Sequence, residues 1–214
     1  MPATAERVQV VVLAAGAGTR FGGDKLSALL DGRPILQHVL DAIATAGADE
    51  PIVVVPPSRL EAAAIDWRGA KRVVNPDPAR GLSSSVRVAW SAALAGSSEA
   101  NAVLILLGDQ PTVEPALIRA LLDAPLDSSR PVLASRHRDG SPNPVRVEIA
   151  AASWIESLDG DRGFGPLLDS HPELVRWLDG GGSNPDVDEP SDLEALERAR
   201  GIGSGSGDHP GDSA

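Results

Sequence analysis

Short apolar segments alternate along the chain with longer segments in which apolar residues recur at helical spacing. Strands are predicted at the short runs rich in apolar and β-branched residues, which are residues 8–13, 52–55, 72–74, 102–107 and 131–134. Helices are predicted between them, at residues 34–46, 58–65, 83–95 and 113–122, with Ser58 as the cap of the second. This order predicts an α/β fold: a single-domain three-layer α/β/α sandwich around a mostly parallel, Rossmann-like sheet.

The periodicity weakens after Asp139. Strands are indicated at residues 143–147 and 174–178, and helices at residues 150–157, 164–168 and 191–199. Ser191 stands where the N-cap of the last helix is expected. The final stretch is rich in Gly, Ser and Asp, a composition typical of disorder. The sequence therefore predicts one domain over residues 1–200, followed by a disordered tail over residues 201–214.

Composition narrows the class of protein. The chain has 214 residues, of which 42% are hydrophobic, which is enough for one domain with a sizeable core. It contains no cysteine, which excludes disulfides and thiolate metal sites. No segment has the pattern of a secretory signal or of a membrane span, so we expect a soluble cytoplasmic protein without a membrane partner. A formal net charge of −11 argues against a nucleic-acid partner.

The most informative segment directly follows the first predicted strand. Between Gly16 and Lys25 it contains four glycines and the cation Arg20. Glycines allow successive backbone N–H groups to turn toward one point, where they bind an anion. Phe21 at the third glycine position excludes the dinucleotide fingerprint, and Asp24 before the lysine excludes a P-loop. We therefore predict a different kind of cradle for a polyphosphate.

Two further segments bring polar groups to the ends of predicted elements. Asp109, within Gly-Asp-Gln-Pro, follows the most apolar strand, at the carboxyl end where ligands bind in open α/β sheets. A carboxylate there suits Mg²⁺, which binds one or two carboxylates together with substrate phosphates. Residues 75–86 bring three serines to a predicted helix N-terminus, where free N–H groups and hydroxyls favour contact with a nucleotide.

Together these motifs resemble those of nucleotidyltransferases that activate a small molecule with an NTP. The loop Leu-Ala-Ala-Gly-x-Gly-x-Arg-Phe-Gly-x-x-Lys is most similar to that of the molybdenum cofactor cytidylyltransferases. Residues 75–86 are similar to that family's Asn-Pro-x-x-x-x-Gly-Met-Ser-Ser-Ser-Leu, with Leu82 and Val86 as departures. Residues 184–193 resemble its closing Asp-Ile-Asp-Thr-Pro-Glu-Asp-Leu, with Glu189 in place of threonine. The resemblance covers about residues 8–200 and implies the nucleotidyltransferase type of Rossmann-like fold.

The resemblance also implies a role for individual residues and a reaction. The expected catalytic residues are Arg20, Lys25 and Asp109, and the expected Mg²⁺ ligands are Asp109 and Asp188, with Asp186 as the alternative to the latter. The expected nucleotide-binding residues are Leu13, Ala14, Ala15, Gly16, Gly18, Lys25, Asn75, Gly81, Ser83 and Ser84. In the implied reaction a phosphate oxygen of an acceptor attacks the α-phosphorus of the NTP and releases pyrophosphate, with Mg²⁺ bridging both phosphates.

Two segments match family elements near the acceptor. Residues 136–145 fall where the resemblance places a Gly-His-Pro-Val-like element, with Asn143 at the histidine position. Residues 159–163 match a Gly-Asp-x-Gly loop that either clamps the acceptor or forms a tight turn. The implied partners are an NTP, a phosphorylated small-molecule acceptor, with molybdopterin as the implied compound, and a molybdoenzyme or chaperone.

The implied base is cytosine. The dipeptide Ala14-Ala15 marks cytidylyl transfer in the resemblance, and its methyl groups leave less room for a purine, so we expect CTP rather than GTP. Three alternatives stay open. One is a guanylyltransferase or a sugar-phosphate nucleotidyltransferase on the same fold. Another is a family member redirected to a redox role, and the third is a nucleotide-binding module without catalysis.

Overall fold

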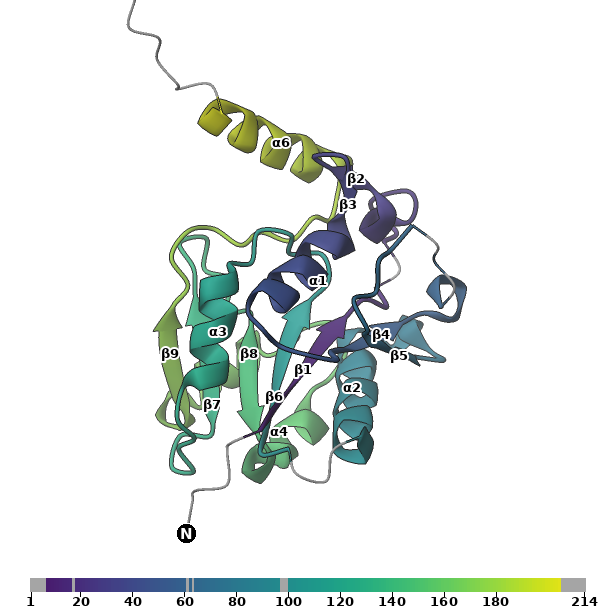
Figure 1. Ribbon diagram of the computed structural model, residues 1–214. Helices are drawn as coiled ribbons and strands as arrows, with labels where there is room; N and C mark the ends of the chain where they lie inside the picture. The colour runs from purple at the N-terminus through teal and green to yellow at the C-terminus, as the bar shows by residue number, and fades with distance from the viewer. Residues whose placement is uncertain (1–6, 17, 61, 63, 97–99, 205–214) are drawn as a thin grey trace, which may run out of the picture.

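A computed structural model describes residues 7–204 except residues 17, 61, 63 and 97–99. Nine strands are present in this part of the chain: β1 (Val8–Leu13), β2 (Leu29–Leu30), β3 (Arg33–Pro34), β4 (Ile52–Val55), β5 (Lys71–Val74), β6 (Ala102–Leu107), β7 (Val132–Arg136), β8 (Val145–Glu148) and β9 (Val175–Asp179). Seven of them form one sheet in the order β5-β4-β1-β6-β8-β7-β9, and β2 pairs with β3 in a small second sheet (Figure 1).

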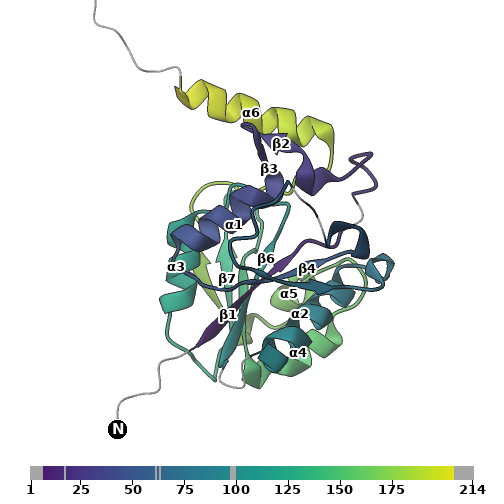
Figure 2. The same cartoon turned by 45° about the vertical axis from the view of Figure 1, so that its right-hand side comes forward.

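Helices cover both faces of the large sheet. The α-helices are α1 (Ile35–Thr45), α2 (Leu82–Gly96), α3 (Pro115–Asp123), α4 (Ala152–Ser157), α5 (Gly165–Ser170) and α6 (Pro190–Ser204). The 3₁₀ turns are η1 (Lys25–Ser27), η2 (Pro57–Arg59), η3 (Pro78–Arg80), η4 (Ile149–Ala151) and η5 (Pro172–Leu174). Apolar residues of α1 and α3 pack into the core on one face, and those of α2, α4 and α5 on the other (Figures 1 and 2). The predicted three-layer sandwich is confirmed.

The strand order places a ligand-binding edge beside β1. β1 pairs in parallel with β4 on one side and with β6 on the other, so their carboxyl ends lie together. The chain moves away from β1 in both directions, which makes this edge the topological switch point where open α/β sheets bind ligands. β8 alone runs against its neighbours, antiparallel to both β6 and β7. The sheet is therefore mostly parallel, as predicted.

The helix expected over residues 58–65 is wrong. Within the described residues this segment contains only the short turn η2 and then irregular chain. Its backbone makes turn hydrogen bonds instead of a helical series, with the Ala62 N–H donating to the Arg59 carbonyl oxygen at 3.1 Å. Arg72 Nη1 donates to the carbonyl oxygen of Leu60 at 2.7 Å, and the side chain of Arg59 turns inward. Tertiary contacts have outweighed the local preference of an Ala-rich segment.

The β2–β3 hairpin is an element that the sequence analysis missed. Its turn consists of Asp31 and Gly32, with φ angles of +50° and +74°. Asp-Gly between two short strands is the signature of a two-residue hairpin turn, because both central residues must adopt positive φ. The hairpin supports α6, which lies across it at one end of the molecule (Figures 1 and 2).

The last helix departs from its predicted start and end. It begins at Pro190, and the side chain that accepts hydrogen bonds there is Asp192 rather than the expected Ser191. It continues to Ser204, past the boundary predicted at residue 200. Residues 205–214 of the predicted tail lie outside the described residues, so the tail stays a prediction. No helix in the described part of the chain is long and apolar enough to cross a membrane.

Arg146 on β8 supports the fold from inside the core. Its side chain is fully buried, and its guanidinium donates to the carbonyl oxygens of Leu121 at 2.8 Å, Ala124 at 2.6 Å and Pro125 at 3.0 Å. These carbonyls lie at the end of α3, where helices leave acceptors without partners.

Arg146→Met is therefore expected to lower the free energy of unfolding by at least about 3 kcal/mol, because several buried acceptors lose their donor. Urea denaturation measures this loss. Arg130→Met removes an exposed arginine paired with Asp127 and serves as the control, with an expected effect below about 0.5 kcal/mol. Equal losses in the two variants would contradict the assigned role of Arg146.

Candidate active site

A cavity of about 510 Å³ opens at the carboxyl edge of the sheet, beside β1 and β6. Nine of the predicted site residues line it: Leu13, Ala15, Gly16, Gly18, Arg20, Lys25, Gly81, Asp109 and Asp188. They come from the segment after β1, from the end of β6, from the start of α2 and from the segment before α6. The fold therefore brings together groups from Leu13 to Asp188, which lie near opposite ends of the sequence.

Four predicted nucleotide-binding residues lie behind the cavity wall instead. Ala14 packs in the core on the α1 side of the sheet. Asn75 is 1% exposed, and its amide nitrogen donates to the hydroxyls of Ser84 at 2.9 Å and Ser85 at 3.0 Å. Ser84 Oγ in turn donates to the Gly81 carbonyl oxygen at 2.8 Å. Ser83 is 3% exposed, so these groups shape the start of α2 without lining the cavity.

Four charged side chains form the centre of the site. Lys25 Nζ lies 2.6 Å from Asp109 Oδ2 and 2.9 Å from Asp188 Oδ1. Arg20 Nη1 lies 3.2 Å from the other oxygen of Asp188. The Lys25 side chain is 8% exposed, whereas Arg20 is 71% exposed. One cation is therefore fixed between two carboxylates, and the second reaches over the mouth of the cavity.

These contacts shift the protonation equilibria in opposite directions. Burial alone lowers the pKa of Lys25, but Asp109 and Asp188 outweigh it and raise that pKa above its ordinary value. The hydrogen bond from Lys25, helped by the charge of Arg20, lowers the pKa of Asp188 against the effect of burial. Desolvation of Asp186 in the cleft, with the charges of Asp109 and then Asp188, raises its pKa to about 6 although Gln110 donates to it.

The pair Asp109 and Asp188 fits a divalent cation. Both carboxylates already direct an oxygen to one position that a cation, the Lys25 ammonium, occupies. Mg²⁺ in phosphate-transfer sites characteristically takes one or two carboxylates and completes its shell with phosphate oxygens and water. No group of three or more His, Cys, Asp or Glu side chains suited to a metal occurs in the described residues. The donor set thus matches a metal that arrives with a phosphate ligand.

The loop over residues 159–163 caps the start of α2. The carbonyl oxygen of Gly160 accepts from the Ser83 N–H at 3.0 Å, and Asp161 Oδ1 accepts from the Leu82 N–H at 3.0 Å. Gly81 has φ +88°, and a Cβ there would lie 2.6 Å from Asp161 Oδ1. Glycine is therefore required at this position by both conformation and space. Asp161 also lines the cavity, so the loop is part of the site.

The sequence analysis missed several lining residues. Ser85 rather than Ser83 or Ser84 faces the cavity, together with Thr19, Pro78, Ala79, Leu82 and Leu107. Asp186, the alternative metal ligand of the sequence analysis, and Asp161, within the predicted loop over residues 159–163, also line it. Helical spacing from Gly81 offered a signal for Ser85, since residues four apart share a helix face. The Gly-Asp-x-Gly motif had marked the loop over residues 159–163, but it did not show that Asp161 reaches this cavity, which depends on how the loop packs against the start of α2.

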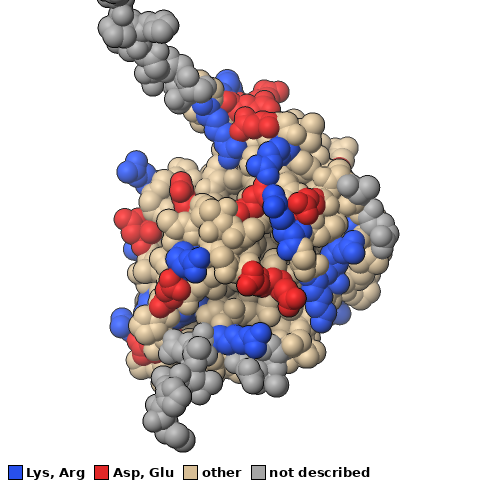
Figure 3. Space-filling view, in the orientation of Figure 1, with Lys and Arg blue, Asp and Glu red and all other residues tan. Residues whose placement is uncertain are grey.

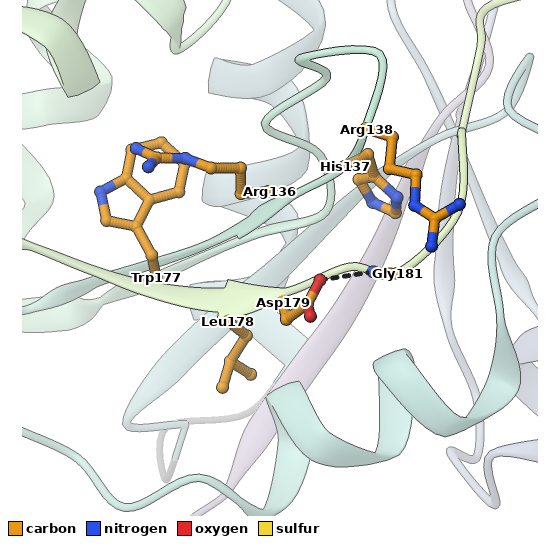
Figure 4. Close-up of a pocket in the computed structure, with 7 residues that line it drawn as sticks. All are labelled: Arg136, His137, Arg138, Trp177, Leu178, Asp179 and Gly181. Carbon is orange, nitrogen blue, oxygen red and sulfur yellow. Dashed lines mark hydrogen bonds between the residues drawn. The ribbon is translucent and has the colours of Figure 1, made fainter.

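A second cavity of about 430 Å³ lies at the ends of β7 and β9. The Arg136 guanidinium lies 4.3 Å from the centre of the Trp177 ring, and Asp179 accepts from the Gly181 N–H (Figure 4). The predicted acceptor element over residues 136–145 runs through this region. Gln110 connects this element to the first cavity, since its amide nitrogen donates to Ser141 Oγ at 3.1 Å and to Asp186 Oδ1 at 2.8 Å.

Charges are mixed on the face of the molecule seen in Figure 3. Acidic side chains are scattered over this face, whereas several basic side chains lie near one another toward its right-hand side.

Comparisons with known proteins agree with this geometry. Residues 10–175 match the family described as MobA-like NTP transferase domain. The bifunctional protein GlmU of Bordetella parapertussis is 36% identical over 121 residues, which are 55% of this chain and 26% of GlmU. The 3-deoxy-manno-octulosonate cytidylyltransferase of Pelobacter propionicus is 30% identical over 148 residues, 65% of this chain and 55% of that enzyme. The chain spans about a quarter of the length of the GlmU relatives it matches.

Solved structures extend the match over nearly the whole chain. Rv0371c from Mycobacterium tuberculosis H37Rv superposes with a TM-score of 0.78 at 29% identity, covering 91% of this chain and 100% of Rv0371c. A manganese complex of Rv0371c superposes with a TM-score of 0.75, also at 29% identity, covering 90% of this chain and 99% of Rv0371c. Because the family match extends over well more than half of the sequence, the chain belongs to the family of MobA-like NTP transferase domains.

Proposed function

We propose that this chain is a divalent-metal-dependent cytidylyltransferase, which transfers CMP from CTP to a phosphate-bearing small molecule and releases pyrophosphate. Molybdopterin, or the molybdenum cofactor built on it, is the proposed acceptor, and Mg²⁺ the proposed metal. The observation that carries the proposal is the convergence of Lys25, Arg20, Asp109 and Asp188 in one cavity at the switch point of the sheet. The family match and the cytidylyltransferase among the relatives support this reaction class.

In the proposed reaction, different residues of the site bind the triphosphate and hold the metal. Backbone N–H groups of the glycine loop (residues 14–24) would surround the triphosphate, and Lys25 and Arg20 would neutralise its charge. A divalent cation held by Asp109 and Asp188 would supply further charge neutralisation on the phosphates. An oxygen of the acceptor phosphate forms the new bond to the α-phosphorus as the bond to the pyrophosphate breaks. No side chain is needed as a general base, because that phosphate is already an anion.

A panel of nucleotides and acceptors tests the proposal. Each of the four NTPs is combined with Mg²⁺ and with molybdopterin, a sugar 1-phosphate or no acceptor, and pyrophosphate release is measured. We expect release with CTP and molybdopterin. Release with a sugar 1-phosphate instead would assign a different acceptor. NTP binding without release under any combination would identify a nucleotide-binding module and overturn the proposal.

The base preference provides a separate prediction. Ala15 lines the cavity, whereas Ala14 faces the core, so the expected discrimination against purines depends on the Ala15 methyl group. One methyl group is worth about 1–3 kcal/mol, and we therefore expect CTP to bind about 10- to 200-fold more tightly than GTP. Ala15→Gly should reduce this ratio. Calorimetry with Mg²⁺ measures both constants, and tighter binding of GTP by the unaltered chain would move the function to guanylyl transfer.

A further inference from the structure

A buried arginine outside the cavity connects the two ends of the glycine loop. Arg59, the last residue of η2, is 7% exposed and does not line the cavity. Its Nη1 donates to the Ala14 carbonyl oxygen at 2.7 Å. The same guanidinium forms an ion pair with Asp24 and donates from Nε to Asp24 Oδ2 at 3.4 Å. Ala14 begins the loop and Asp24 ends it, so one side chain joins the two ends. We call this narrow base of the loop, between Ala14 and Asp24, its neck.

We propose that Arg59 is a positioning residue, which fixes the width of the glycine loop at its neck and thereby sets where the Lys25 ammonium stands. The inference rests on the proposed function, because the loop matters for catalysis only if it holds a triphosphate. Asp24 directly precedes Lys25, and the Lys25 N–H donates to the Gly23 carbonyl oxygen at 3.0 Å. A change in the position of Asp24 therefore moves the backbone of Lys25 with it.

The residues before Arg59 restrict the conformation of the backbone that carries it. It follows Pro56 and Pro57, whose rings fix φ, at the end of strand β4. The Ala14 N–H donates to the Val54 carbonyl oxygen at 2.8 Å, so β4 and the turn after it hold both sides of the Ala14 residue. Two neighbouring elements thus fix one end of the loop, and the guanidinium connects the other end to it.

Arginine is the side chain that suits this place. Its planar group directs several N–H donors in fixed directions, so it reaches a carbonyl and a carboxylate at once, whereas a lysine ammonium is a single point charge. Burial raises the pKa of Asp24, but the hydrogen bonds from Arg59 and Ser27 outweigh it and hold that pKa below its usual value. Asp24 is therefore an anion, as the ion pair requires. Its side chain is 45% exposed, so water can solvate it if Arg59 is removed.

Hydrogen exchange tests the neck directly. In Arg59→Met we expect faster exchange of the amides of Phe21, Lys25 and Ser27, whose turn hydrogen bonds lie within or next to the loop. Exchange in β1 and β4 should stay unchanged. Arg72→Met is the matched control, because the contacts of Arg72 with the Leu60 carbonyl beside η2 and with the Trp67 ring lie outside the loop. It should leave exchange in the loop unaltered.

Nucleotide binding tests the positioning role. We expect the affinity for CTP with Mg²⁺ to fall on the order of tenfold in Arg59→Met and in Arg59→Lys, and to stay unchanged in Arg72→Met. Binding of cytidine, which has no phosphate, should be much less affected, whereas a general loss of structure would weaken both ligands alike. Adding Asp24→Asn to Arg59→Met should cause little further loss, because the two residues act through one contact.

The outcomes separate this inference from the proposed function. Normal exchange in the Arg59→Met loop, or equal losses for CTP and cytidine, would overturn the positioning role while CTP binding by the unaltered chain stands. Failure of the unaltered chain to bind any NTP would instead overturn the proposed function, and the exchange measurement would still decide whether Arg59 holds the neck.

Discussion

Replacing Asp109 with asparagine is expected to abolish nucleotidyl transfer while leaving the fold intact. The amide keeps nearly the size and shape of the carboxylate, and the Asp109 backbone carbonyl that accepts from the Val187 N–H is unaffected. The change removes one of two negative charges that would hold the metal against the phosphates. We expect kcat to fall at least about a hundredfold, as when one stabilising group is lost from a transition state. Pyrophosphate release with Mg²⁺ measures the loss, and thermal unfolding monitors the fold.

Two comparisons make this result specific. Asp49→Asn changes an exposed aspartate just before β4, at the opposite edge of the sheet, and should retain full activity. Asp188→Asn should be inactive like Asp109→Asn. Inactive Asp186→Asn beside active Asp188→Asn would correct only the choice between these two ligands. Full turnover in Asp109→Asn, or of the unaltered chain in EDTA, would reject the metal site.

Lys25→Ala is expected to change two affinities in opposite directions. Binding of CTP with Mg²⁺ should weaken about tenfold or more, because a charge-assisted phosphate contact is lost. Binding of Mn²⁺ without nucleotide should become tighter. The reason is that the Lys25 ammonium lies 2.6 Å from Asp109 and 2.9 Å from Asp188, at the position to which both carboxylates point. A divalent cation must displace it, and in the variant that competitor is absent.

Calorimetric titrations with Mn²⁺ alone and with CTP measure both effects. Lys71→Ala is the control, because Lys71 is exposed at the start of β5, away from the cavity, and neither affinity should change. Weaker Mn²⁺ binding in Lys25→Ala would show that the lysine assists the metal instead of competing with it. Unchanged CTP binding would remove Lys25 from the phosphate site.

Much of the fold followed from the hydrophobic pattern. β1, β4 and β6 have the predicted bounds, because each is a short, mainly apolar run that is largely buried in the sheet, with Gln9 of β1 as the one polar residue. The hydrophobic pattern could not reveal that β8 runs antiparallel to β6 and β7. A four-residue run can form a parallel or an antiparallel strand, and its neighbours in the folded sheet decide which. The helix predicted over residues 58–65 was wrong for a related reason, because Arg59 there contacts the Ala14 carbonyl oxygen, which is distant in the sequence.

Only some residues of the candidate site could be predicted from the sequence. Residues just beyond the carboxyl ends of predicted strands, such as Gly16 and Asp109, lie at the cavity because a strand of known direction ends beside it, and Lys25 was marked by its place in the glycine motif. Ser83 and Ser84 do not line the cavity, whereas Ser85 does. The rotation of α2 about its axis decides which serine faces the cavity, and a short motif does not encode that rotation. Arg59 had no motif at all, and only the folded chain shows that it reaches the Ala14 carbonyl oxygen.

The segment that carries Asp188 has a consequence for how the protein is made. Val187 is fully buried and donates through its N–H to the carbonyl oxygen of Asp109 at 3.0 Å, so the two carboxylates meet only when this late segment docks onto the end of β6. A growing chain that has not yet reached Val187 already contains all seven strands of the large sheet and the whole glycine loop. Such a chain contains Asp109 but not Asp188, so it cannot yet form the acidic pair. The order of synthesis therefore delivers the glycine loop first and the second carboxylate of the pair last.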